Sequence, residues 1–100
     1  MELEVDELLG TKDLALRVWA DELFTLLSAM NDQVFILDFS NIRFVSGSFA
    51  NEYLKQKKNF KAKITERNVD ASLKKMFDVA DHIVVRKVVH ASKASTLRNL

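Results

Sequence analysis

Apolar and polar residues alternate at the start of the chain. Leu3 and Val5 fall on one face of an extended segment, and Glu2 and Glu4 fall on the other. A period of two is typical of a half-buried β-strand, because successive side chains point to opposite faces. We therefore predict a short edge strand within residues 1–10, and its free edge is a candidate surface for a homodimer.

The next stretch has the spacing of an amphipathic helix. Its apolar residues recur at steps of three and four, which places them on one side of an α-helix. They are Leu16, Ala20, Leu23, Leu27 and Met30. Thr11 offers a side-chain oxygen that can cap the first turn, and Asn31 and Asp32 end the pattern. The spacing predicts a helix over residues 12–30.

A continuous apolar run follows this helix. Val34, Phe35, Ile36 and Leu37 are bounded by polar residues on both sides. Short runs of this kind are typical of strands that are covered on both faces. We predict that this run is the central strand of the sheet.

The second half of the chain continues the alternation of helices and strands. Ser46 or Ser48 can cap a helix that runs to about Lys58, and Asp70 can cap a helix over residues 71–80. The remaining predicted elements are strands at 62–69 and 83–89 and a polar tail at 91–100.

The predicted order is therefore strand, helix, strand, helix, strand, helix, strand. Such alternation is typical of α/β folds, in which helices cover a sheet. A length of 100 residues suits one domain. We predict a single small α/β domain over residues 1–100, with a mostly parallel or mixed four-stranded sheet packed by about three helices.

The composition narrows the classes of function. Fifteen Lys and Arg against 14 Asp and Glu leave a net charge of +1, so no overall field attracts nucleic acid or an anionic membrane. The absence of Cys and the presence of only two His argue against a metal site and exclude a thiolate nucleophile. No apolar run approaches the length of a membrane span, and no Gly-rich phosphate loop is present. We expect a cytoplasmic protein that is not an enzyme and uses no cofactor.

The most specific motif follows the predicted central strand. An apolar strand ends in Leu-Asp, a short turn follows, and a Ser-containing sequence opens the next helix. The residues that carry this motif are Leu37-Asp38-Phe39, Ser46, Ser48-Phe49 and Glu52. The arrangement resembles the signature of STAS domains, the fold of bacterial anti-sigma-factor antagonists, and is closer still to a STAS-like family of unassigned function. The predicted elements over about residues 11–89 also follow the STAS order.

The resemblance implies a regulatory protein-binding module. In anti-sigma-factor antagonists, a kinase partner phosphorylates the serine that corresponds to Ser48, so the implied partner is a histidine-kinase-like ATPase or an anti-sigma-type regulator. A phosphate there would add roughly −1.5 to −2 charge. The chain departs from the pattern at Ser46, where Asp is usual, and at Gly47, where Ser is common. The implied partner-binding residues are Asp38, Asn41, Ser46, Gly47, Ser48, Asn51 and Glu52.

Simpler roles also explain these residues. Both serines can act as helix caps alone. Asp38 lies at the end of a predicted strand. An aspartate in this position more often accepts hydrogen bonds from loop amides in an Asx-type turn than acts as a base. The lysines from Lys55 to Lys63 complement the negative end of a helix dipole. They also support an alternative function as a small nucleic-acid-binding domain.

Overall fold

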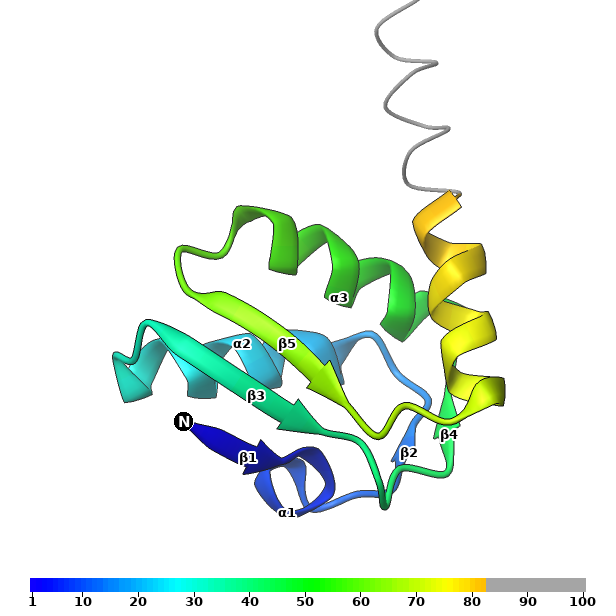
Figure 1. The fold of residues 1–100 in the computed structure, drawn as a ribbon. Coiled ribbons are helices and arrows are strands. Elements are labelled where there is room, and N and C mark those ends of the chain that lie inside the picture. Colours follow the sequence, from blue (N-terminus) through cyan, green and yellow to red (C-terminus); the bar gives the residue numbers. More distant parts are fainter. Residues whose placement is uncertain (83–100) are drawn as a thin grey trace, which may run out of the picture.

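A parallel sheet built around one central strand organises residues 1–82, which the computed structural model describes (Figure 1). Its strands are β1 (Glu2–Glu4), β3 (Val34–Asp38) and β5 (Lys63–Arg67), in the order β1-β3-β5. β3 pairs in parallel with both neighbours, so that Leu37 lies opposite Leu3 on one side and opposite Glu66 on the other. The prediction that the apolar run forms the central strand is confirmed.

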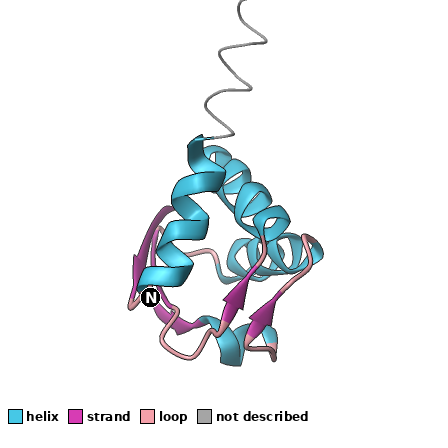
Figure 2. Ribbon diagram, turned by 90° about the vertical axis from the view of Figure 1, so that its right-hand side faces the viewer, coloured by secondary structure: helices cyan, strands magenta, loops and turns pink. Residues whose placement is uncertain are grey.

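Helices cover one face of this sheet (Figure 2). Phe35 and Leu37 point to that face and are fully buried, whereas Val34 on the opposite face is 46% exposed and Ile36 is half-buried. The prediction that β3 is covered on both faces is therefore wrong for the described part of the chain. Val34 and Ile36 on the open face are apolar, like Phe35 and Leu37 on the covered face. The sequence of β3 therefore lacks the alternation of apolar and polar residues that usually marks a strand with one open face.

A second, smaller sheet leads into helix α3 (Gly47–Asn59). Its strands, β2 (Asp13–Leu14) and β4 (Phe44–Val45), pair in parallel. The amide of Ser46 extends this pairing by donating a hydrogen bond of 3.0 Å to the carbonyl of Leu14. The start of α3 is therefore anchored to a strand that lies far away in the sequence.

A short helix replaces part of the predicted N-terminal strand. The strand predicted within residues 1–10 ends at Glu4, and Val5–Leu9 form helix α1. Gly10 ends α1 in the left-handed region at φ 73°, where its amide donates to the carbonyl of Asp6. A glycine adopts this conformation without the steric cost that a Cβ brings.

Helix α2 spans Val18–Met30, so the prediction that it begins near residue 12 is wrong. Thr11 does not cap it. The Thr11 hydroxyl oxygen accepts a hydrogen bond of 3.1 Å from the amide of Asp13, within the turn that enters β2. The predicted end is confirmed, because Asn31 closes the helix in the left-handed region at φ 54°.

The core lies between α2, α3 and the covered face of the sheet. Tyr53 of α3 is at its centre and is 1% exposed. Its ring contacts Phe24, Phe39, Phe49 and Phe77, with centroid separations of 5.4 to 6.3 Å. Aromatic side chains bury large apolar areas and favour tilted, edge and offset-stacked contacts, and all three kinds occur here. This packing fixes α3, and with it the first turn of that helix.

A further helix covers residues 71–82 and packs beside α3 (Figure 1). As predicted, Asp70 caps it, because Asp70 Oδ1 accepts hydrogen bonds from the amide of Leu73 at 3.0 Å and from the hydroxyl of Ser72 at 2.8 Å. These bonds hold the pKa of Asp70 below its ordinary value. The strand predicted at 83–89 and the tail at 91–100 lie outside the described residues, so a fourth strand of the sheet stays a prediction.

The described residues thus form an α/β domain with four helices and parallel sheets of three and two strands. Within residues 1–82, no helix combines the length and the apolar character that crossing a bilayer requires.

Candidate functional site

Ser46 and Ser48 lie together at the start of α3. Ser46 is the N-cap, with extended backbone angles (φ −79°, ψ 161°), and its Oγ accepts a hydrogen bond of 3.0 Å from the amide of Phe49. Ser48 lies in the first turn and is exposed, with its Oγ 3.1 Å from that of Ser46. Of the two predicted caps, Ser46 is therefore the one used, and Ser48 is an exposed residue whose hydroxyl is hydrogen-bonded to that of Ser46.

A small groove of about 250 Å³ adjoins this first turn. It lies between α3 and the helix at residues 71–82, and its lining residues are Gly47, Ser48, Asn51, Met76, Val79 and Ala80. A Cβ added to Gly47 would lie 3.9 Å from Met76 Sδ, an ordinary contact, so neither the backbone nor the space at this position requires glycine. The side-chain oxygen of Asn51 is buried here and has no hydrogen-bond donor among the described residues. The groove thus presents mainly apolar walls beside Ser48.

Asp38 does not face this groove but joins two strand ends. Its Oδ1 accepts hydrogen bonds from the side-chain amide of Asn68 at 3.1 Å and from the backbone amide of Ser40 at 2.9 Å. The Asn68 bond, the Ser40 bond and nearby Arg67 lower the pKa of Asp38. The bond to Ser40 is the predicted Asx-type turn, and Asn41 is exposed in the turn that follows.

Glu52 lies on another side of α3. It forms an ion pair of 3.6 Å with Arg17, which precedes α2, and it lines a separate groove of about 380 Å³ with Phe24, Lys55 and Phe60. Of the seven predicted partner-binding residues, the structure therefore brings together four, which are Ser46, Gly47, Ser48 and Asn51. Asp38, Asn41 and Glu52 lie elsewhere on the domain.

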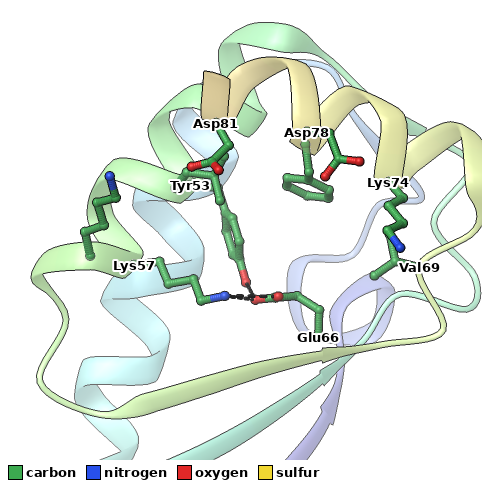
Figure 3. A pocket seen from close by; sticks show the side chains of 10 residues that line it. Tyr53, Lys57, Glu66, Val69, Lys74, Asp78 and Asp81 are labelled. Atoms are coloured by element: carbon green, nitrogen blue, oxygen red, sulfur yellow. Dashed lines mark hydrogen bonds and ion pairs between the residues drawn. The ribbon is translucent and has the colours of Figure 1, made fainter. Parts of the chain in front are cut away.

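A larger cavity, of about 710 Å³, was not predicted from the sequence (Figure 3). It lies between α3, β5 and the helix at residues 71–82. In its wall, Glu66 accepts a hydrogen bond of 2.5 Å from the Tyr53 hydroxyl. The ammonium of Lys57 lies 3.0 Å from one oxygen of the same carboxylate and 2.8 Å from the other. The spacing of Tyr53 and Lys57 places both on one side of a helix, but their shared partner on β5 is visible only in three dimensions.

The Tyr53 hydroxyl is a donor in this cavity rather than a base. Burial of the ring raises the pKa of Tyr53 well above its ordinary value, and the negative charge of Glu66 raises it further. A neighbouring ammonium such as that of Lys57 favours a phenolate, but the carboxylate lies between the two groups and opposes it. The phenol therefore stays protonated at neutral pH.

The lysines from Lys55 to Lys63 do not share one role. Lys57 is paired with Glu66, and Lys58 lines the cavity beside Tyr53. Lys55 lines the groove on the α2 side. These three side chains are thus divided between two concave surfaces beside α3, whereas Lys61 and Lys63 are exposed and line neither.

The described residues contain no group of three or more His, Cys, Asp or Glu side chains arranged to hold a metal ion. Comparison of the chain with protein-family models, with curated proteins and with solved structures found no match. Its function must therefore be inferred from its own residues.

Proposed function

We propose that this chain is a regulatory protein-binding module of STAS-like type, acting in the cytoplasm, in which a histidine-kinase-like ATPase binds the start of α3 and phosphorylates Ser48. One observation carries most of the support. Ser48 is exposed in the first turn of α3, whose N-cap Ser46 directly follows strand β4. A serine at the start of this helix is what the resemblance to STAS domains implies. A kinase needs an accessible hydroxyl, and this one lies on a rigid element.

The helix start also suits a phosphate. The first amides of an α-helix lack acceptors within the helix, and the helix dipole favours negative charge at this end. A phosphate on Ser48 would therefore be tolerated by α3 itself. It would place about −1.5 to −2 charge beside the apolar groove of Met76 and Val79, which changes what that groove can bind.

Phosphate transfer to the purified full chain tests this function. The chain is incubated with ATP and, one at a time, with each histidine-kinase-like ATPase encoded by the same genome, and the modified residue is mapped by mass spectrometry. We expect one phosphate on Ser48 with one of these ATPases. The Ser48→Ala variant should not be modified, whereas Ser28→Ala, which changes an exposed serine of α2, should be modified like the wild type.

Binding is measured in parallel, because a partner can bind without transferring phosphate. Titration calorimetry of each ATPase against the wild type and against Ser48→Glu should show a change in affinity for one of them. If no ATPase binds the chain and none modifies Ser48, the function proposed here is wrong.

A further inference from the structure

The two helical walls of the large cavity carry opposite charges. Lys57 and Lys58 line the cavity from α3, whereas Asp78 and Asp81 line it from the helix at residues 71–82. Figure 3 shows both aspartates on that helix, which forms the upper wall in this view. Because the two aspartates are three positions apart, they lie on the same side of their helix. The cavity is thus bordered by ammonium groups on one side and by carboxylates on another.

These charges do not neutralise one another. In the described part of the chain no ion pair joins the two helical walls, and Lys58, Asp78 and Asp81 form no ion pair at all. Lys57 is paired with Glu66, but an ammonium has three N–H groups, and the two carboxylate oxygens engage at most two of them. Donors and acceptors in both walls can therefore bind a ligand without breaking a bond inside the protein.

Apolar side chains line the same cavity. Leu54, Val69 and Phe77 each contribute to its surface and are half-buried. Its volume of about 710 Å³ lies within the range of roughly 300–1,000 Å³ that is typical of small-molecule sites. Such sites combine apolar walls with a few polar groups that orient the ligand. The cavity therefore has the size and the lining of a ligand site.

The signs of the charges indicate the class of ligand. An anion such as phosphate is attracted by Lys58 but is repelled by Asp78 and Asp81, and a simple cation meets the reverse arrangement. Lys74, which lines the cavity one turn before Asp78, only partly offsets the two carboxylates. A molecule that carries both an ammonium and a carboxylate can form charge-assisted hydrogen bonds with both helical walls at once.

We propose that this cavity binds a small zwitterion with an apolar body, of the amino-acid or short-peptide class. The ligand carboxylate accepts hydrogen bonds from Lys57 and Lys58, and the ligand ammonium donates to Asp78 and Asp81. The apolar body packs against Phe77. This binding does not depend on the function proposed above, which concerns the start of α3.

Titration of the isotope-labelled full chain, followed by amide chemical shifts in NMR spectra, tests this site. The two probes are L-leucine and L-leucyl-L-leucine, and the probe that binds more tightly distinguishes an amino-acid site from a peptide site. We expect saturable shifts in the cavity residues, with a dissociation constant of roughly 10 µM to 1 mM. The N-acetyl form and the C-terminal amide of the same probe should each bind at least about tenfold more weakly, because each lacks one charge.

Two variants assign the charges to the walls. Lys58→Met should weaken binding of the unmodified probe by about threefold or more, but should leave binding of its amide nearly unchanged. Asp81→Asn should do the same for the unmodified probe and leave its N-acetyl form nearly unchanged. Lys55→Met and Glu22→Gln are the matched controls and should bind like the wild type, since Lys55 lines the other groove of α3 and Glu22 is exposed on α2. Circular dichroism verifies that each variant is folded.

Three outcomes would overturn the proposal. The first is the absence of shifts in the cavity residues with both probes at concentrations up to about 10 mM. The second is equal affinity for the unmodified and the capped probes, which would mean that the charges are not recognised. The third is wild-type binding by both Lys58→Met and Asp81→Asn. None of these results bears on phosphorylation of Ser48, so the two proposals can fail separately.

Discussion

The hydroxyl of Tyr53 donates a hydrogen bond of 2.5 Å to Glu66, across the space between α3 and β5. Glu66 also pairs with Lys57, one helical turn further along α3. A buried hydroxyl and a half-buried carboxylate thus satisfy each other, which avoids the cost of an unpaired polar group in the core. This contact ties α3 to β5, an outer strand of the three-stranded sheet in residues 1–82.

The pKa of Tyr53 predicts a loss of stability in alkali. Burial and Glu66 raise this pKa in the folded state above its value of about 10 in the unfolded state. The stabilising contribution is complete below about pH 10 and is lost as the pH rises towards the folded-state pKa. Tyr53 is the single tyrosine of the chain, so near-ultraviolet phenolate absorbance reports on it alone. Phenolate appearing near pH 10 in the folded protein would contradict this.

The Tyr53→Phe variant separates the hydroxyl from the ring. At neutral pH we expect it to lose about 1 to 2 kcal/mol in the free energy of unfolding, because Glu66 loses one donor while the ring packing remains. Above about pH 10 its stability should depend less on pH than that of the wild type. Urea unfolding at several pH values measures both effects.

The two serines at the start of α3 should differ in their contribution to stability. Ser46→Ala removes the cap of the Phe49 amide and should cost about 1 kcal/mol, whereas Ser48→Ala should change stability by less than about 0.5 kcal/mol. Ser46→Asp keeps an acceptor and should restore most of the loss. Equal losses for the two alanine variants in urea unfolding would contradict this assignment.

Asp38 should contribute to stability only when it is ionised. The bonds from Asn68 and Ser40 lower its pKa, so its contribution is present above about pH 4 and is lost as the pH falls through the folded-state pKa. Asp38→Ala should therefore lower the melting temperature at neutral pH, and the difference from the wild type should shrink in acid. Asp38→Asn keeps an acceptor for both donors, so its melting temperature at neutral pH should lie between those of the wild type and Asp38→Ala.

The helix at residues 71–82 should depend on Phe77. Its ring lies 5.4 Å from that of Tyr53 and 5.9 Å from that of Phe39, centroid to centroid. Phe77→Ala removes both contacts and should cost about 2 kcal/mol. Hydrogen exchange should then accelerate in residues 71–82 while protection in β3 is retained. Uniform acceleration across the domain would show that the helix does not open separately.

The elements predicted correctly have strong local patterns. The apolar residues 34–37 indicate β3, and Ser46 and Asp70 mark the starts of two helices by their capping oxygens. Each of these signals depends on residues that are close in the sequence. Local chemistry was therefore sufficient to predict their positions.

The missed elements are short or depend on distant partners. α1 has five residues, too few for a clear helical period, although buried Val5 and Leu9 have the spacing of one helical turn. β2 and β4 have two residues each and exist because they pair with each other. The cavity beside Tyr53 could not be predicted for the same reason, since Glu66 approaches Lys57 only after β5 has joined the sheet.

Within residues 1–82, the β1-β3-β5 sheet contains no hairpin. Each of its pairings, β1 with β3 and β3 with β5, joins strands that a whole helix separates in the chain. During synthesis β1 therefore has no strand to pair with until β3 has left the ribosome, by which point all of α2 has been made. Long loops must close before these contacts stabilise the chain, which slows folding. Early in translation, the described helices can form from neighbouring residues alone, whereas the described strands cannot.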